Sequence, residues 1–144
     1  MKISDAGHAL TQGFEQCRLT AYWDALGKIW TVGWGATGKD ICQGTVWTQE
    51  QADMEYMARR SEDEAVVNRH VTVGISQGSF DALCDFVYND GDGAFEESTL
   101  LRLLNDGQIM AAAAEFIKWD HSGGVVVPGL LRRRIAERDM FLSS

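Results

Sequence analysis

The sequence predicts an α+β domain, in which a small antiparallel sheet near the N-terminus lies beside a larger helical lobe. Three observations support this prediction. Aromatic and β-branched residues gather between positions 20 and 34, and glycines punctuate the chain from 27 to 44. From position 48 onward, apolar residues recur at helical spacing. The length of 144 residues fits a single domain with a sizeable core.

An N-terminal helix is expected first. Ser4 or Asp5 can cap it, because both side chains accept hydrogen bonds from backbone amides of a first helical turn. Leu10 and Phe14 lie four residues apart on one face, and the helix is expected to end near Glu15.

The small sheet is expected in segment 20–46, where β-forming residues alternate with turn glycines. We expect residues 1–144 to form one domain. Its sheet-containing lobe covers about 15–47, and its helical lobe covers about 48–144 and packs with helix 4–14.

The helical lobe begins with a long helix. Thr48 and Gln51 predict a capping box, because Gln51 at the third helical position can reach back to the Thr48 amide. This helix is expected to run to about Arg69. Another helix starts at Ser76, and the residues at i, i+3, i+4 and i+7 predict one buried stripe: Phe80, Leu83, Cys84 and Val87.

Three further helices are expected toward the C-terminus. Residues 98–105 predict a short helix, and 108–119 an alanine-rich buried helix that is broken at 122–124. Pro128, the only proline, fits the first position of a final helix that runs through Phe141.

No metal or cofactor is expected. Residues 89–93 carry an Asp-x-Gly pattern but lack the spaced ligands and terminal glutamate of an EF-hand loop, so they predict a turn. The cysteines Cys17, Cys42 and Cys84 lack CxxC spacing and are interpreted as small buried hydrophobes. No Walker or dinucleotide glycine pattern is present.

The charge balance argues against a nucleic-acid partner. The chain has 13 basic and 21 acidic side chains, a net charge of −8, whereas nucleic-acid binding relies on neutralising phosphates. No apolar run approaches the roughly 20 residues that span a bilayer, so stable membrane insertion is not expected. The N-terminus lacks the apolar core of a signal peptide. We expect a monomer that is made in the cytoplasm.

Glu15 and Asp24 are the candidate catalytic pair. Two carboxylates in different environments are the minimum equipment for cleaving a glycosidic bond. Glu15 ends a helix just past Phe14, where partial loss of hydration suits a carboxyl that donates a proton. Asp24 precedes a turn and is expected to be solvated and ionised, and Thr31 is expected to expose its hydroxyl to water. The alternative is an ordinary helix-end glutamate and turn aspartate.

Other catalytic classes lack their motifs. His8, His70 and His121 lie outside any His-Glu-x-x-His context. Residues 76–79 predict a helix start and not a Gly-x-Ser-x-Gly elbow, so a serine triad has no anchor. Metal-free hydrolysis is the remaining prediction.

Motifs spread over nearly the whole chain occur together in one order: Phe14–Asp24, Trp30–Gly38, Phe86–Phe95, Ser98–Leu101, Trp119, Gly123–Gly124, Gly129–Leu130, Arg133–Arg134 and Glu137. Together they resemble the phage-type lysozymes, glycoside hydrolase family 24, and most closely the small endolysins of lambdoid phages. The resemblance implies a lysozyme-like fold with an active-site cleft between the two lobes.

The resemblance also implies an activity. Such enzymes hydrolyse the β-1,4 bond between N-acetylmuramic acid and N-acetylglucosamine in bacterial peptidoglycan, and inversion at the anomeric carbon is expected. By resemblance, Glu15 is the general acid, Asp24 activates or steers the water, and Thr31 helps to hold that water.

Three supporting residues are carried over in the same way. Tyr88 and Asn89 resemble the cleft wall that holds the sugar, and Arg133 resembles the arginine that pairs with the acid from the C-terminal helix.

The chain departs from the family pattern in the turn after Asp24. Six residues separate Asp24 from Thr31, where the family usually has five. A one-residue change flips side chains across a strand, so the extra residue must be absorbed before Thr31. Ala36 also stands where a histidine often follows the second glycine, and the chain is more acidic than many relatives.

The resemblance predicts a phage or prophage endolysin that lyses the host cell. It would be made in the host cytoplasm and released to the periplasm or cell wall through a holin. Three alternatives stay open: a tail lysozyme or antibacterial effector with the same chemistry, a catalytically inactive wall-binding module, and an enzyme that prefers chitin.

Overall fold

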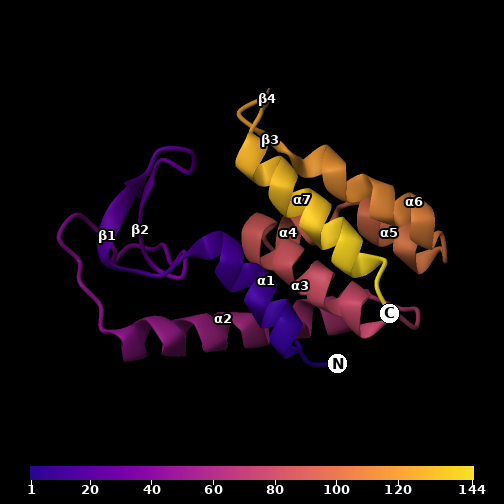
Figure 1. The fold of residues 1–144 in the computed structure, drawn as a ribbon, viewed down its shortest axis with the longest axis horizontal. Helices are drawn as coiled ribbons and strands as arrows, with labels where there is room; N and C mark the ends of the chain where they lie inside the picture. Colours follow the sequence, from indigo (N-terminus) through magenta and orange to yellow (C-terminus); the bar gives the residue numbers. More distant parts are fainter.

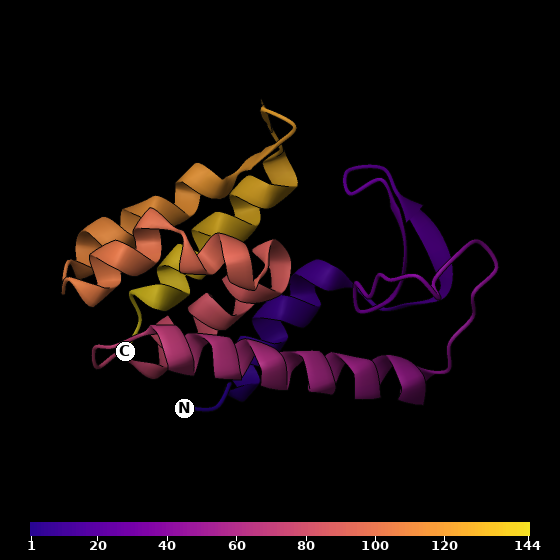
Figure 2. The same ribbon diagram turned by 180° about the vertical axis from the view of Figure 1, so that it is seen from behind.

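A computed structural model describes residues 1–144 (Figure 1). A small sheet lies at one end of the molecule and a cluster of helices at the other. Helix α2, Gln49–His70, runs along the base of both parts, as Figure 2 also shows from behind. The mixed architecture confirms the predicted α+β class with its small antiparallel sheet.

Helix α1 spans Asp5–Glu15, as predicted, and the Ser4 side chain caps it by accepting a hydrogen bond from the Gly7 amide. The predicted apolar face is wrong, because Phe14 is exposed and the buried residues are Gly7 and Thr11. A Cβ at Gly7 would lie 2.7 Å from the carboxyl carbon of Asp81. The missing side chain therefore allows α1 to pack closely on the neighbouring helix.

The sheet consists of β1, Arg18–Asp24, and β2, Ile29–Gly33, paired antiparallel. The register places Tyr22 opposite Thr31 and Asp24 opposite Ile29. The connection at 25–28 turns through Lys28, which has a positive φ of 53°. This connection lies between Asp24 and Thr31, where the sequence places the extra residue.

The two long helices of the base and core begin as predicted. Thr48 and Gln51 form a complete capping box at the start of α2. Helix α3, Gln77–Asp90, is capped by Ser76 and is buried on almost every side. All four residues of its predicted stripe are buried: Phe80, Leu83, Cys84 and Val87.

The remaining elements are short until the last helix: α4 Asp92–Glu96, α5 Thr99–Asn105, α6 Ile109–Glu115, the 3₁₀ helix η1 Phe116–Trp119, β3 His121–Ser122, β4 Val125–Val126 and α7 Pro128–Phe141. One expectation needs correction. Residues 89–93 are not one turn, because only Gly91 separates α3 from α4. The expected break at 122–124 is confirmed, and it is a β-hairpin turn in which Gly123 and Gly124 both take positive φ.

The core lies around α3, which packs against α1, α2 and α7. Phe86 is completely buried and makes edge-on aromatic contacts with Phe116 and Trp119 at centroid distances of 5.9 and 5.1 Å. Of the three cysteines, all unpaired, only Cys84 is buried. The prediction is wrong for Cys42, which is exposed, and for Cys17, which is partly exposed.

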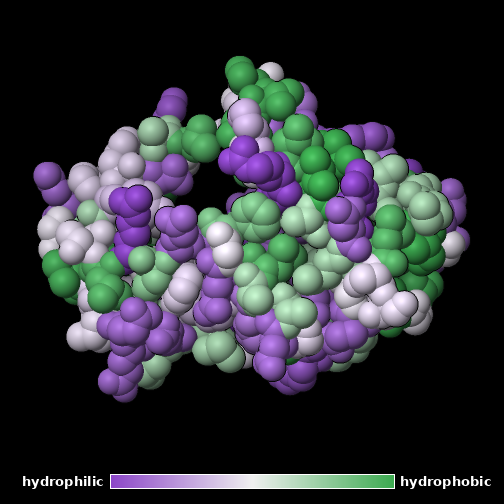
Figure 3. Space-filling model, viewed as in Figure 1, coloured by the Kyte–Doolittle hydropathy of each residue, from purple (hydrophilic) through white to green (hydrophobic).

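The surface view shows an opening between the sheet and the helices (Figure 3). Hydrophilic and hydrophobic side chains are interspersed on this face. No helix of the structure has both the length and the apolar character needed to cross a membrane.

Candidate active site

Glu15 is the last residue of α1, where the helix ends abruptly. Gln16 follows with φ 40°, a left-handed backbone conformation that is uncommon for a non-glycine residue and tends to occur at functional sites. The Glu15 side chain is 18% exposed, so most of its surface is covered while part of it remains accessible to solvent. The helix end therefore presents a single carboxyl group.

Arg133 holds one oxygen of this carboxyl. Its Nη1 donates to Glu15 Oε1 at 2.6 Å, which joins the end of α1 to α7 across 118 residues of chain. This is the contact expected from the sequence resemblance. Its short, charge-assisted geometry fixes the direction in which the carboxyl points.

The other oxygen of Glu15 faces the backbone of Gly35. A tight turn joins Val32 and Ala36 by two backbone hydrogen bonds of 3.0 and 2.8 Å, and Gly35 sits in it with φ 91°. A Cβ at Gly35 would lie 2.5 Å from Glu15 Oε2. The glycine is therefore required both by its φ and by the approach of the carboxyl.

Asp24 ends β1 and is partly exposed. Its Oδ1 accepts a hydrogen bond from the Leu26 amide at 3.0 Å, which is the local turn that aspartate commonly stabilises. A Cβ at Gly27 would lie 3.0 Å from Oδ2, so the turn backbone also covers the second oxygen. The carboxylate is oriented without an ion pair, as expected for a solvated group.

Tyr22 lies within reach of the charges of both carboxyl groups, and sequence reasoning did not single it out. Partial burial raises the pKa of its hydroxyl, and the negative charges of Asp24 and Glu15 raise it further. Both carboxyl groups therefore act on the same phenol. The signal available in the sequence was its position, because residues 22 and 24 point to the same face of a strand.

Thr31 shares that face, since it pairs with Tyr22 and lies diagonally from Asp24. The predicted exposed hydroxyl is wrong, because Thr31 is 3% exposed and its Oγ1 donates to the Ile29 carbonyl at 3.3 Å. The donated proton leaves the oxygen lone pairs as acceptors.

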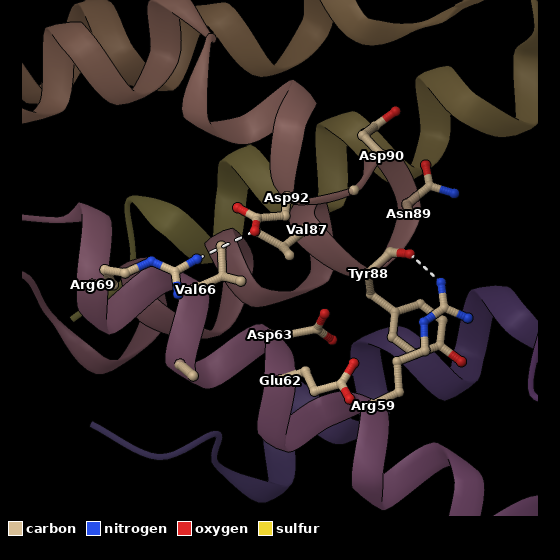
Figure 4. A pocket seen from close by; sticks show the side chains of 12 residues that line it. Arg59, Glu62, Asp63, Val66, Arg69, Val87, Tyr88, Asn89, Asp90 and Asp92 are labelled. Atoms are coloured by element: carbon tan, nitrogen blue, oxygen red, sulfur yellow. Dashed lines mark hydrogen bonds and ion pairs between the residues drawn. The ribbon is translucent and has the colours of Figure 1, made fainter.

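Tyr88 and Asn89 end α3 beside a polar pocket of about 570 Å³, drawn in Figure 4. Tyr88 is buried, and its hydroxyl donates to the Trp34 carbonyl. Asn89 accepts a hydrogen bond from Arg134 through Oδ1 at 2.9 Å. Tyr88 therefore presents no free hydroxyl to a ligand, whereas Asn89 retains its amide NH₂.

Arg59 of α2 is a second residue that the sequence did not indicate. It donates to the carbonyl oxygens of Gly35 at 3.2 Å and Tyr88 at 2.7 Å, and its guanidinium stacks 3.8 Å from the Tyr88 ring. Figure 4 shows this side chain on the pocket wall. The contacts join the turn next to Glu15 to the end of α3.

Asp63 lies in the same pocket and is 5% exposed. Burial raises the pKa of its carboxyl to about 7, although the charge and hydrogen bond of Arg60 oppose the rise. This pocket therefore contains a carboxyl that changes charge near neutral pH.

A second pocket, of about 430 Å³, lies beside the end of α1. It is lined by Phe14 and Gln16, which flank Glu15, and by Arg133. Leu26 of the β1–β2 turn and Val127 before α7 also line it, so the sheet and the helical part face each other there. Glu15 lines neither pocket itself. Its immediate neighbours line this one, and Tyr88, on whose hydroxyl its charge acts, lines the first.

Comparison with known proteins gives consistent matches. The phage lysozyme family model matches residues 12–137. An endolysin of Bacillus phage PZA is 43% identical over 146 residues, which cover 99% of this chain but 56% of the relative. The chain thus spans just over half the length of that relative.

Two solved structures cover the chain almost completely. The muramidase domain of SpmX from Asticaccaulis excentricus is 33% identical, with a TM-score of 0.87 and 99% of both chains covered. An endolysin from Escherichia coli O157:H7 phage FAHEc1 is 32% identical, with a TM-score of 0.88, 99% of this chain and 94% of the other covered. The chain belongs to the phage lysozyme family.

Proposed function

We propose that this chain is a muramidase that acts as an endolysin, hydrolysing the bond between N-acetylmuramic acid and N-acetylglucosamine in bacterial peptidoglycan. The observation that carries the proposal is the placement of Glu15. One oxygen is held by Arg133 at 2.6 Å, and the other faces Gly35 at the opening toward Asp24 and Tyr22. The names of the related proteins, endolysin and muramidase, support the same activity.

In this proposal Glu15 is the general acid. Arg133 occupies only Oε1, so Oε2 is the oxygen that can carry the proton to the glycosidic oxygen. Asp24 accepts a proton from the attacking water, and the Thr31 oxygen accepts a hydrogen bond from the same water. Diagonal neighbours on a sheet face lie roughly 7–8 Å apart, which leaves room for a water between them. We expect inversion of the anomeric centre, because a water activated by Asp24 would attack the anomeric carbon directly, without a covalent intermediate.

Tyr88 and Asn89 have supporting roles in the proposal. Asn89 offers its amide NH₂ to a sugar, and Tyr88 holds the cleft wall through Trp34 and Arg59. The division into lobes at about 15–47 and 48–144 belongs to the same proposal, with the cleft between them. A monomeric state, holin-dependent release and action in the periplasm or wall stay predictions.

Glu15→Gln tests the assignment of the acid. The variant should fold normally and lose at least about 100-fold in activity on purified peptidoglycan, because an amide cannot donate the proton. Release of reducing ends is the measurement, and mass analysis of the products should show a free muramic reducing end. Full turnover by the variant would end the assignment. Binding of wild-type protein without release of reducing ends would favour the wall-binding alternative.

A further inference from the structure

A buried network of charges lies directly behind Glu15, and Arg133 is its centre. The guanidinium donates to Asp85 from two nitrogens, Nε at 2.9 Å and Nη2 at 2.8 Å, and uses Nη1 for Glu15. Two parallel hydrogen bonds to one carboxylate fix the plane of a guanidinium, so the direction of Nη1 is set by Asp85.

Asp85 is itself immobilised. It is completely buried in α3, and its Oδ1 also accepts a hydrogen bond from Thr11 of α1 at 2.7 Å. Asp85 thus lies where α1, α3 and α7 meet. Hydrogen bonds to this one carboxylate therefore link α1 and α7 to α3.

We propose that Asp85 is a positioning residue for the acid: it orients Arg133 against Glu15 and offsets the positive charge of the arginine that contacts the acid. This inference rests on the proposed function of Glu15 and extends it to a residue that does not touch the substrate.

Two electrostatic requirements conflict at this site. A general acid must hold a proton, yet an arginine at 2.6 Å favours the carboxylate form of its partner. Asp85 resolves the conflict because it forms a fully buried, two-point pair with the same guanidinium, at 2.9 and 2.8 Å. Burial alone would raise the pKa of Asp85, but the charge and hydrogen bonds of Arg133 outweigh it and hold that pKa well below its usual range. Arg133 and Asp85 therefore form a pair without net charge.

Glu137 of α7 borders this pair, with its Oε1 3.8 Å from Arg133 Nε. Burial raises its pKa, and the charge of Asp85 raises it further, to well above the usual value for a glutamate. Its Oε2 has no hydrogen-bond partner, and its Oε1 accepts from Arg134 at 2.7 Å. The charged and titratable groups around Asp85 come from α3 itself and from the helices packed on it: Glu15 of α1, Tyr56, Arg60 and Asp63 of α2, Asp90 of α3, and Arg133, Arg134 and Glu137 of α7.

Asp85→Asn tests the proposal through the pH dependence of peptidoglycan hydrolysis, with kcat and KM measured separately between pH 4 and 9. The uncompensated arginine would favour ionised Glu15, so the alkaline limb of the profile should move to lower pH by about one unit. The amide nitrogen of asparagine cannot accept from Arg133, so kcat at the optimum should also fall about tenfold, with little change in KM.

Asp81→Asn is the matched control. Asp81 lies one turn earlier in α3, is equally buried and holds Ser4 and Gln77, but it does not contact Arg133. This control should lose stability and leave the alkaline limb in place. Arg133→Lys is a second variant that retains the charge but lacks the two-point geometry. It should lower kcat without moving the limb, and it decides the question if Asp85→Asn does not fold.

The positioning role would be overturned if the alkaline limb of the pH profile did not move in folded Asp85→Asn, or moved only as far as in Asp81→Asn. Either result would leave the muramidase proposal intact. Wild-type kcat in Arg133→Lys would overturn it equally. A wild-type protein that releases no reducing ends would remove the muramidase proposal and this inference together.

Discussion

Gly35→Ala tests whether the position of Glu15 controls activity independently of the stability of the fold. A methyl group at this site would lie 2.5 Å from Glu15 Oε2, and ordinary contacts of a Cβ begin at 3.4 Å. The far end of a flexible side chain gives way more easily than backbone, so the Glu15 carboxyl should move by about 0.9 Å. The hydrogen bond from Arg133 would be distorted by the same displacement.

The expected magnitudes differ for activity and stability. A misplacement of about 1 Å at a catalytic group can cost roughly 100-fold in rate, so kcat/KM should fall by about that factor. The positive φ of 91° costs an alanine about 1–2 kcal/mol of folding free energy. Reducing-end release measures the first quantity, and urea denaturation measures the second.

Gly44→Ala provides the matched control. Its φ is 88°, nearly that of Gly35, but no atom lies within 4 Å of its added Cβ. The control should therefore lose about the same stability while retaining its activity. If Gly35→Ala were as active as Gly44→Ala, the close approach of the Gly35 backbone to Glu15 would have no catalytic importance.

Two further predictions concern pH and packing. The folded pKa of Asp63 is raised from 3.8 to about 7, so the folded protein binds more protons than the unfolded chain between these values, and stability falls as pH rises through this window. Asp63→Asn removes this loss. In urea titrations, the free energy of unfolding of the variant should therefore rise relative to that of the wild type by up to about 1.4 kcal/mol per pH unit between pH 4 and 7. Glu64→Gln should show the opposite trend. Hydrogen bonds from Lys2 and Ile3 outweigh burial and lower the folded pKa of Glu64, so this group adds stability that is lost as pH falls. Parallel slopes of stability against pH for the two variants would contradict this assignment. Phe86→Ala should cost about 3–5 kcal/mol by urea denaturation, because it empties a completely buried site between Phe116 and Trp119, and a loss below 1 kcal/mol would show that the core collapses around the gap.

The local elements were largely predictable because their signals are local. Ser4, Thr48 and Ser76 accept hydrogen bonds from amides within three residues, so they mark helix starts without reference to the rest of the chain. The stripe on α3 was predictable for a similar reason, since periodicity alone shows which face is apolar. Burial of α1 was not predictable. Its buried face depends on which helix approaches it, and Gly7 permits the approach of Asp81.

The candidate site was only partly visible in the sequence. The resemblance supplied Glu15, Asp24, Thr31 and Arg133, and the structure brings Glu15 and Arg133 into direct contact. The exposure of the Thr31 hydroxyl was predicted wrongly, because strand spacing defines a face of the sheet and not what covers it.

The sequence by itself determined the α+β class, most helix boundaries and the family, since each depends on neighbouring residues or on motifs in order. Only the tertiary structure decided how the charges pair. Asp85, Arg133 and Glu15 are separated by at least 48 residues, and many other acids lie nearer to Arg133 along the chain. Burial selects among these pairings, because a charge removed from water must meet a partner of opposite sign, and only the folded chain determines which partner is within reach.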